Sequence, residues 1–168
     1  MRFEKVSYSA FADDVRKWYR PIKPEELFDR WNGIRLPERK TKYSCGYDLE
    51  TPLDIVLAPH TSIVIPTGIR VVFSEEERET WHLKLYARSS VGIKDQVVIT
   101  NGTGLVDSDF SDSENEGDML IALTNMSDEV RKYKAGNRVC QAVFEIYGIT
   151  SDDRASGART GGTGSTGK

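Results

Sequence analysis

The stretch Asn101-Gly-Thr-Gly-Leu-Val-Asp-Ser-Asp-Phe110 combines turn residues, a short apolar run and two carboxylates. Residues 97–100 form an apolar run before it, and two strand-like arms around Asn-Gly predict a β-hairpin. A hairpin tip with little side-chain bulk offers backbone N–H and C=O groups to the edge of a planar base. Asp107 is placed to orient an attacking water, and the Phe110 ring to stack on a sugar or base. On this segment alone, an ordinary tight hairpin with solvated carboxylates is the favoured alternative.

The composition is that of one globular domain. At 168 residues the chain can bury a full core. The formal net charge of −3 implies no general attraction to nucleic acid, so we expect no direct nucleic-acid binding. No apolar run reaches membrane-spanning length and the N-terminus lacks a signal-peptide pattern, so we expect a cytoplasmic protein without membrane contact. Cys45 and Cys140 match no metal-ligand spacing, and we expect both to be reduced, small apolar fillers.

Three segments differ in pattern. They predict an N-terminal helical extension over residues 1–33, a β domain over 34–150 and a flexible glycine-rich C-terminal arm over 151–168. Ser9 is the expected N-cap of a first helix, and Pro24 begins a second. The apolar faces of these helices are Phe11, Val15 and Trp18, then Leu27, Phe28 and Trp31. We expect both helices to dock on the main domain, and a role in binding an unknown protein partner stays open.

Many short apolar or alternating runs separated by turn residues predict the β domain. The expected strands cover residues 54–58, 61–65, 69–73, 81–87, 119–124 and 139–149. Such a series indicates a sandwich or barrel. Two acidic stretches, 74–79 and 112–117, are predicted to be exposed loops. The second resembles a calcium loop but has Leu123 where the bidentate glutamate is required, so calcium binding is rejected.

Four further motifs accompany the central stretch. Ser44-Cys-Gly-Tyr-Asp-Leu49 places Asp48 after a turn glycine, and Ala87-Arg-Ser-Ser90 ends a strand with a cation and two hydroxyls that suit a phosphate. Gly136-Asn-Arg-Val-Cys-Gln141 begins a strand with a cation and an amide. The glycine-rich tail can wrap phosphates through its N–H groups, or it can be a disordered end. Each motif alone is weak evidence.

In order and spacing, these five motifs resemble those of the trimeric deoxyuridine triphosphate nucleotidohydrolase (dUTPase) family over residues 34–168. The resemblance implies an all-β jelly-roll fold with a short helical N-terminal extension, and a homotrimer with active sites between subunits. It implies hydrolysis of dUTP to dUMP and pyrophosphate assisted by Mg²⁺. That reaction keeps uracil out of DNA and supplies dUMP for thymidylate synthesis.

The resemblance also implies roles for individual residues. Asp107 would orient the water that attacks the α-phosphate, and Asp48 would hold Mg²⁺ through water. Phe110 would pack on the deoxyribose, where family members usually have tyrosine. The uracil-reading residues would be Asn101, Gly104, Leu105 and Val106. The phosphate contacts would be Arg88, Ser89, Ser90, Gln141, Arg159, Ser165 and Thr166.

Three departures from the family pattern affect the tail more than the chemistry. An acidic insertion occupies residues 111–116, Thr163 stands where an aromatic residue usually stacks on uracil, and Arg154 competes with Arg159 for the role of tail arginine.

Two other functions remain as alternatives. The related dCTP deaminases place a catalytic glutamate where this chain has Ala122 and an arginine where it has Ile93, which argues against deamination. A dUTPase-like regulatory protein that binds a partner through the N-terminal helices is the third reading.

Overall fold

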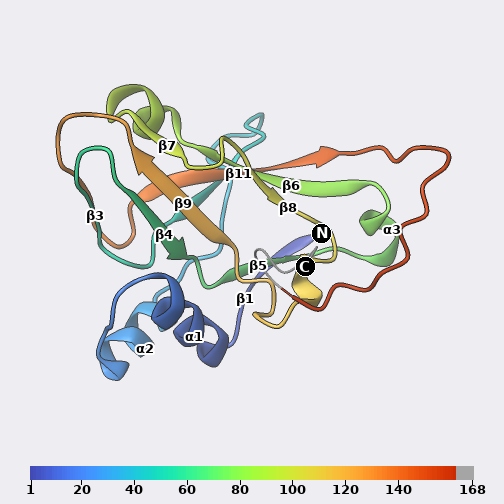
Figure 1. Ribbon diagram of the computed structural model, residues 1–168, viewed down its shortest axis with the longest axis horizontal. Helices are drawn as coiled ribbons and strands as arrows, with labels where there is room; N and C mark the ends of the chain where they lie inside the picture. The colour runs from blue at the N-terminus through green and yellow to red at the C-terminus, as the bar shows by residue number, and fades with distance from the viewer. Residues whose placement is uncertain (162–168) are drawn as a thin grey trace.

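The computed structural model describes residues 1–161 and consists mainly of β-strands (Figure 1). The strands are β1 (Arg2–Lys5), β2 (Tyr47–Glu50), β3 (Ile55–Leu57), β4 (Ser62–Pro66), β5 (Ile69–Val72), β6 (Trp81–Ala87), β7 (Val97–Ile99), β8 (Gly104–Val106), β9 (Leu120–Asn125), β10 (Arg131–Tyr133) and β11 (Arg138–Ile146). The helices are α1 (Tyr8–Trp18), α2 (Pro24–Asn32) and α3 (Glu75–Arg78), with a π-helical turn at Ser90–Lys94 and a 3₁₀ turn at Phe110–Asp112. The prediction of an all-β fold with a short helical N-terminal extension is confirmed.

The strands form antiparallel sheets that do not close into a barrel within residues 1–161. A four-stranded sheet has the order β2-β11-β6-β8, and a three-stranded sheet has the order β4-β9-β7. Two further pairs, β1-β5 and β3-β10, complete the set. The predicted alternation of β6 is confirmed at its centre, where Leu83 and Leu85 are buried in the core. None of the helices in these residues has the length and apolar character needed to cross a membrane.

The predicted hairpin around Asn101 and Gly102 is wrong. Strand β7 pairs with β9, whereas β8 pairs with β6, so the two arms belong to different sheets. The connection is a tight turn in which the Gly102 N–H donates to the Ile99 carbonyl at 2.9 Å, with Gly102 at φ +79°. The local sequence specifies the turn, but the strands that pair with each arm lie elsewhere in the chain.

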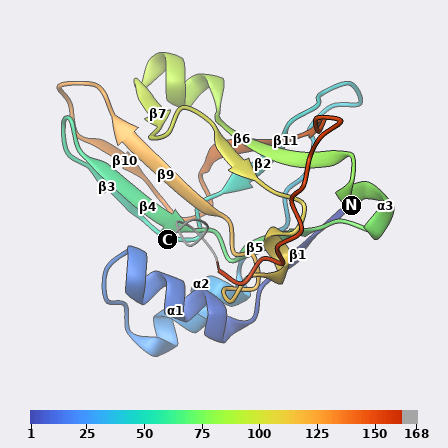
Figure 2. The ribbon, with the colours of Figure 1, turned by 45° about the vertical axis from the view of Figure 1, so that its right-hand side comes forward.

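The N-terminal extension docks on the β domain, as predicted. Strand β1 pairs with β5, and the two helices lie against the sheet side that carries β4 (Figures 1 and 2). Phe11 and Val15 are buried, and the Trp31 indole N–H donates to the Val6 carbonyl at 3.0 Å. The N-cap of α1 is Ser7 and not the predicted Ser9, because the Ser7 hydroxyl accepts from the Ala10 N–H.

The predicted exposed loops differ from the structure in two ways. The first stretch is exposed at Ser74, Glu75, Glu76 and Glu79, as predicted, but it is not a loop. Residues 75–78 form helix α3, which begins with a capping box between Ser74 and Glu77. The second stretch folds against the extension. Its Glu116 carboxylate accepts from the Ser7 N–H at 2.8 Å and the Ser7 hydroxyl at 2.6 Å, and Asn115 donates to Asp14 at 2.9 Å. The acidic insertion and the N-terminal helix therefore hold each other in place.

The two cysteines have different environments. Both are free thiols, as predicted, but Cys45 is exposed in the loop before β2 while Cys140 is buried in β11. Burial raises the pKa of the Cys140 thiol to about 12. The expectation of a small apolar filler is therefore confirmed for Cys140 and wrong for Cys45.

Candidate active site

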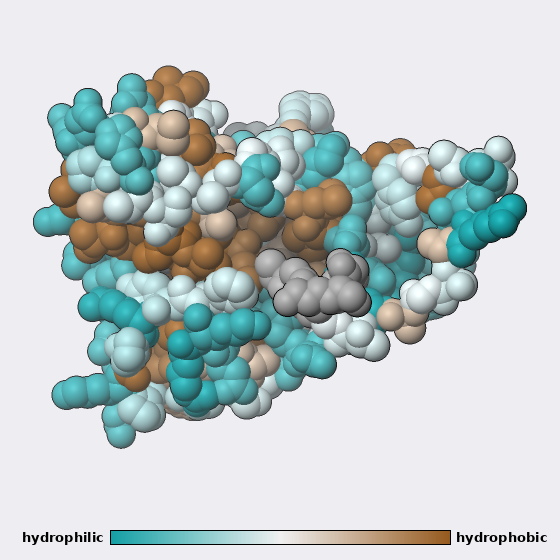
Figure 3. All heavy atoms as spheres, in the orientation of Figure 1, coloured by the Kyte–Doolittle hydropathy of each residue, from teal (hydrophilic) through white to brown (hydrophobic). Residues whose placement is uncertain are grey.

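A cavity of about 320 Å³ lies where α1, β8 and the 3₁₀ turn meet the sheet β4-β9-β7. Its apolar lining comes from Val64, Leu85, Ile99, Leu105, Val106, Met119, Leu120, Ile121 and Ala122. The rest of the lining consists of two aromatic residues (Trp18 and Phe110), three polar residues (Asn101, Asp107 and Arg159) and Gly104. Apolar atoms gather in a band across this face of the molecule (Figure 3). The cavity thus has the predominantly apolar, sparsely polar character of a small-molecule site.

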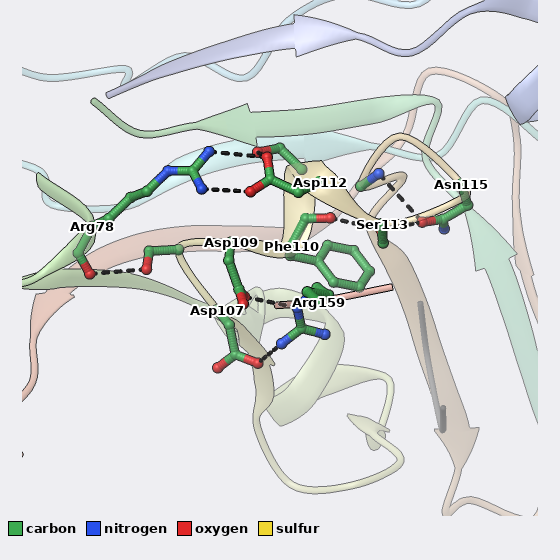
Figure 4. Close-up of polar contacts among 11 residues, drawn as sticks. Arg78, Asp107, Asp109, Phe110, Asp112, Ser113, Asn115 and Arg159 are labelled. Carbon is green, nitrogen blue, oxygen red and sulfur yellow. Dashed lines mark hydrogen bonds and ion pairs between the residues drawn. The ribbon is translucent and has the colours of Figure 1, made fainter. Parts of the chain in front are cut away.

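The carboxylates at the rim of this cavity are paired with one arginine (Figure 4). Arg159 forms an ion pair with Asp107 through Nη2 and donates from Nε to Asp109 Oδ1 at 2.7 Å. Its guanidinium also lies over the Phe110 ring, 5.5 Å from the centroid. Only 11% of the Arg159 side chain is exposed, whereas Arg154 is an exposed residue. Of the two candidate tail arginines, Arg159 is the one that reaches this cavity.

The C-terminal segment turns back after β11 to bring Arg159 to the 3₁₀ turn (Figures 1 and 2). The neighbouring loop is anchored on its other side by Arg78, the last residue of α3. The Arg78 guanidinium binds Asp112 through two hydrogen bonds, and its carbonyl accepts from the Ser108 hydroxyl at 2.9 Å (Figure 4). The hydrogen bond from Arg78 holds the pKa of Asp112 below its ordinary value. Sequence reasoning missed Arg78, because it lies outside all five motifs.

A second group of predicted site residues gathers around Asp48 on β2. The Arg88 Nε forms an ion pair with Asp48 Oδ1 at 2.9 Å, and Arg138 Nη1 donates to Asp48 Oδ2 at 3.0 Å. Gln141 of β11 is the register partner of Asp48. Ser89 and Ser90, which also belong to this group, are exposed at the end of β6. This group therefore presents hydroxyls, an amide and two cations around a carboxylate that is 12% exposed.

The Asp48 group and Asp107 lie at opposite ends of β6. Gln141 pairs with both Asp48 and Tyr86, so the Asp48 group gathers where β6 ends before Arg88. Strand β8 runs antiparallel to β6 and Val106 pairs with Leu83, so Asp107 follows β8 near the other end of β6, level with His82. The six residues of extended chain between His82 and Arg88 span roughly 20 Å. Within one chain, a phosphate beside Asp107 therefore cannot also contact the Asp48 group.

The remaining predicted residues cannot be placed. Ser165, Thr166 and Thr163 lie outside the described residues 1–161. Within those residues, no three His, Cys, Asp or Glu side chains are grouped closely enough to hold a metal ion directly.

Comparison with known proteins gives a consistent result. The family model for dUTPase matches residues 32–167. The deoxyuridine 5'-triphosphate nucleotidohydrolase of Lactococcus lactis is 36% identical over 138 residues, covering 80% of this chain and 89% of that protein.

Solved structures agree with this. The dUTPase of Streptococcus mutans is 26% identical with a TM-score of 0.66, covering 90% of this chain and 99% of the other. A mutant dUTPase from phage phi11 of S. aureus, described as coordinating a structural Mg(II) ion, has the same fold at 23% identity and a TM-score of 0.57, covering 73% of this chain and 90% of the other. The chain described here belongs to the dUTPase family.

Proposed function

We propose that the protein hydrolyses dUTP to dUMP and pyrophosphate. The observation that carries this proposal is the cavity itself: an apolar pocket with Asn101 and strand β8 in its lining and the carboxylate of Asp107 at its rim. Membership of the dUTPase family supports the same reaction.

Uracil would be recognised by the free edge of β8. Among residues 1–161 this strand pairs only with β6 and ends the order β2-β11-β6-β8, so within these residues its other edge has backbone N–H and C=O groups without strand partners. The Watson–Crick edge of uracil has a matching row of acceptors and a donor. Gly104 allows β8 to approach β6 closely, since a Cβ there would lie 3.0 Å from the Leu85 Cβ. A thymine methyl group would clash with such an edge, and the cytosine amine would leave backbone groups mispaired.

The chemistry assigned to Asp107 is the orientation and activation of a water toward the α-phosphate. Its carboxylate is 52% exposed and its Oδ2 is paired with Arg159, so the arginine competes with a water for that oxygen. A bound triphosphate offers Arg159 a stronger partner of higher charge. We infer that substrate binding transfers Arg159 from Asp107 to the phosphates, where its charge stabilises the transition state. Phe110, already beneath the guanidinium, would pack on the deoxyribose.

The position of the two residue groups supports a homotrimer. The cations around Asp48 suit a triphosphate and the cavity suits a nucleoside, but the Asp48 group and Asp107 lie at opposite ends of β6 within one chain. One substrate can use both only if the cavity of one subunit faces the Asp48 group of its neighbour. A closed ring of subunits with head-to-tail interfaces provides this arrangement at every site.

A Mg²⁺ ion fits the Asp48 group through its water ligands. Asp48 Oδ2 accepts one hydrogen bond from Arg138 and Oδ1 is ion-paired with Arg88, so the carboxylate keeps lone pairs that can accept hydrogen bonds from metal-bound waters. When bound, Mg²⁺ would neutralise charge on the phosphates. Arg88 would orient the same phosphates, and Ser89, Ser90 and Gln141 would add neutral hydrogen bonds.

Parallel assays of pyrophosphate release from dUTP, dCTP, dTTP and UTP test the proposal. We expect turnover with dUTP alone, because Asn101 and the edge of β8 select uracil and Phe110 excludes a 2′-hydroxyl. Comparable efficiency with any other nucleotide would contradict it. Ammonia release from dCTP would indicate deamination, although the titratable residues among the described lining are only Asp107 and Arg159, and Ala122 supplies no acid or base.

A further inference from the structure

One wall of the cavity comes from outside the part of the chain that the dUTPase family model matches. Trp18, the last residue of α1, lines the cavity together with Asn101, Phe110 and Ala122. The dUTPase family model begins at residue 32, so the extension that carries Trp18 is additional to the matched region. Residues 151–168, by contrast, contain no Phe, Tyr, Trp or His. The aromatic surface of this cavity is therefore divided between the 3₁₀ turn and α1.

Helix α1 is fixed at several points along its length. Glu116 binds the N-cap residue Ser7, and one turn before Trp18 the buried Asp14 accepts from Asn115 at 2.9 Å. Just after the helix, the Tyr19 hydroxyl donates to the Asp54 carbonyl. With Phe11 and Val15 buried beneath it, the helix cannot rotate about its axis without breaking these contacts. Trp18 thus occupies the cavity wall as a pre-positioned side chain.

The contacts around Trp18 suit a base better than a phosphate. The lining residues on the sheet against which α1 packs include Val64 of β4 and Ala122 of β9, which are register partners. These side chains are apolar, and the cations Arg88 and Arg138 lie with the other residue group. The Lys17 ammonium lies over the Trp18 ring, 5.0 Å from its centroid, and the remaining indole surface beside this apolar floor offers the desolvated contact that a pyrimidine ring needs.

We propose that Trp18 is a substrate-binding residue that packs on the uracil ring, so that the N-terminal extension forms part of the nucleotide site. This proposal rests on the proposed dUTP hydrolysis. It gives the extension a function within the enzyme: the acidic insertion and α1 interlock in order to hold Trp18 at the cavity.

Steady-state kinetics of Trp18→Ala and Trp18→Phe test the assignment. Loss of base stacking should raise KM for dUTP by roughly 5- to 100-fold in Trp18→Ala with kcat changed little, and Trp18→Phe should recover most of the loss. Inhibition by dUMP should weaken in parallel, whereas inhibition by inorganic pyrophosphate should not change. The matched control is Phe28→Ala, an aromatic residue of the same extension that is 48% exposed and absent from the cavity lining.

Fluorescence provides a second readout that does not depend on turnover. The chain has three tryptophans, and only Trp18 lines the cavity among the described residues. We expect dUMP to quench the emission of the wild-type protein and of Phe28→Ala, and to leave that of Trp18→Phe unchanged. Unchanged KM in both Trp18 variants, or equal quenching in Trp18→Phe, would overturn the assignment even if dUTP is hydrolysed. A wild-type protein that does not hydrolyse dUTP would instead refute the proposed function.

Discussion

The separation of Asp107 from the Asp48 group, at opposite ends of β6, predicts that neighbouring subunits share each active site. Asp107→Asn removes the proposed base from the cavity group, and Arg88→Gln removes a phosphate-binding cation from the Asp48 group. Asp107→Asn is nearly isosteric, so we expect an intact fold with turnover lowered about 10²–10⁴-fold. Arg88→Gln should likewise be nearly inactive, because neutral amides bind phosphate far more weakly than guanidinium does.

A hybrid trimer containing both variants should regain activity. In a ring of three subunits, a functional site needs an intact Asp107 on one side of an interface and an intact Arg88 on the other. Any trimer that contains both variants, in either ratio, has one such interface among its three. We therefore expect about one third of the wild-type turnover per trimer, since head-to-tail interfaces in a closed ring are equivalent.

Co-expression with two different affinity tags, followed by purification on both, isolates these hybrids. The matched control combines Arg88→Gln with Asp48→Asn, which removes the carboxylate proposed to hold Mg²⁺ through water. Both residues lie in the Asp48 group, so every interface of that hybrid lacks one of them and it should stay inactive. Hybrids of Asp107→Asn with Arg88→Gln that are no more active than either parent would refute the shared site. If the control hybrid also shows about one third of the wild-type turnover, the assignment of its two substituted residues to one group is refuted.

Other substitutions test the packing and the arm. Asn125→Ala removes five hydrogen bonds of a fully buried side chain, to Leu57, Ala58, Glu129 and twice to Ser127. We expect this variant to lose about 3–5 kcal/mol in the free energy of unfolding. A thermal midpoint within 2 °C of wild type would contradict this. Burial raises the pKa of Asp118 well above its ordinary value, and its Oδ2 has no hydrogen-bond partner among the described residues. The folded state therefore holds the Asp118 proton to higher pH than the unfolded state, so the residue lowers stability as pH rises above the ordinary aspartate pKa. The thermal midpoint of Asp118→Asn should therefore rise relative to that of wild type as pH increases from 4 to 8. Parallel pH profiles of the two proteins would refute the reasoning. Truncation after Gly148 removes Arg159 and the rest of the arm, and should lower dUTP turnover strongly while size-exclusion elution still indicates a trimer; full activity would show that the arm is dispensable.

Local hydrophobic periodicity was sufficient to predict the helices and strands that bury one face. The apolar spacing of α1 and α2 and the alternation in β6 predicted these elements within a few residues. The errors arose where partners are distant in sequence. The Asn101–Gly102 turn looked like a hairpin because nothing local shows that β7 pairs with β9 and β8 with β6.

The acidic stretches show a second kind of limit. Charged residues predict solvent exposure, but Glu116 finds an N-cap hydroxyl and backbone N–H more than 100 residues away, at Ser7. That contact becomes visible only once α1 is docked on the sheet.

Some residues of the candidate site could be predicted from local sequence motifs, and others could not. The motifs identified Asp107, Asn101 and Arg88, because each carries chemistry in a recognisable order. No motif pointed to Trp18 or Arg78, which belong to helices and act through contacts made by folding. The separation of the residues into two groups also could not be predicted, since it depends on the register in which β6 pairs with β8 and β11.

The position of ¹⁸O after hydrolysis of dUTP in H₂¹⁸O tests the central claim most directly. If a water held by Asp107 attacks the α-phosphate, the label is incorporated into dUMP and the released pyrophosphate is unlabelled. Asp107→Asn serves as the background control, because it should release neither product at a comparable rate. Label in pyrophosphate, or release of orthophosphate in its place, would contradict the account.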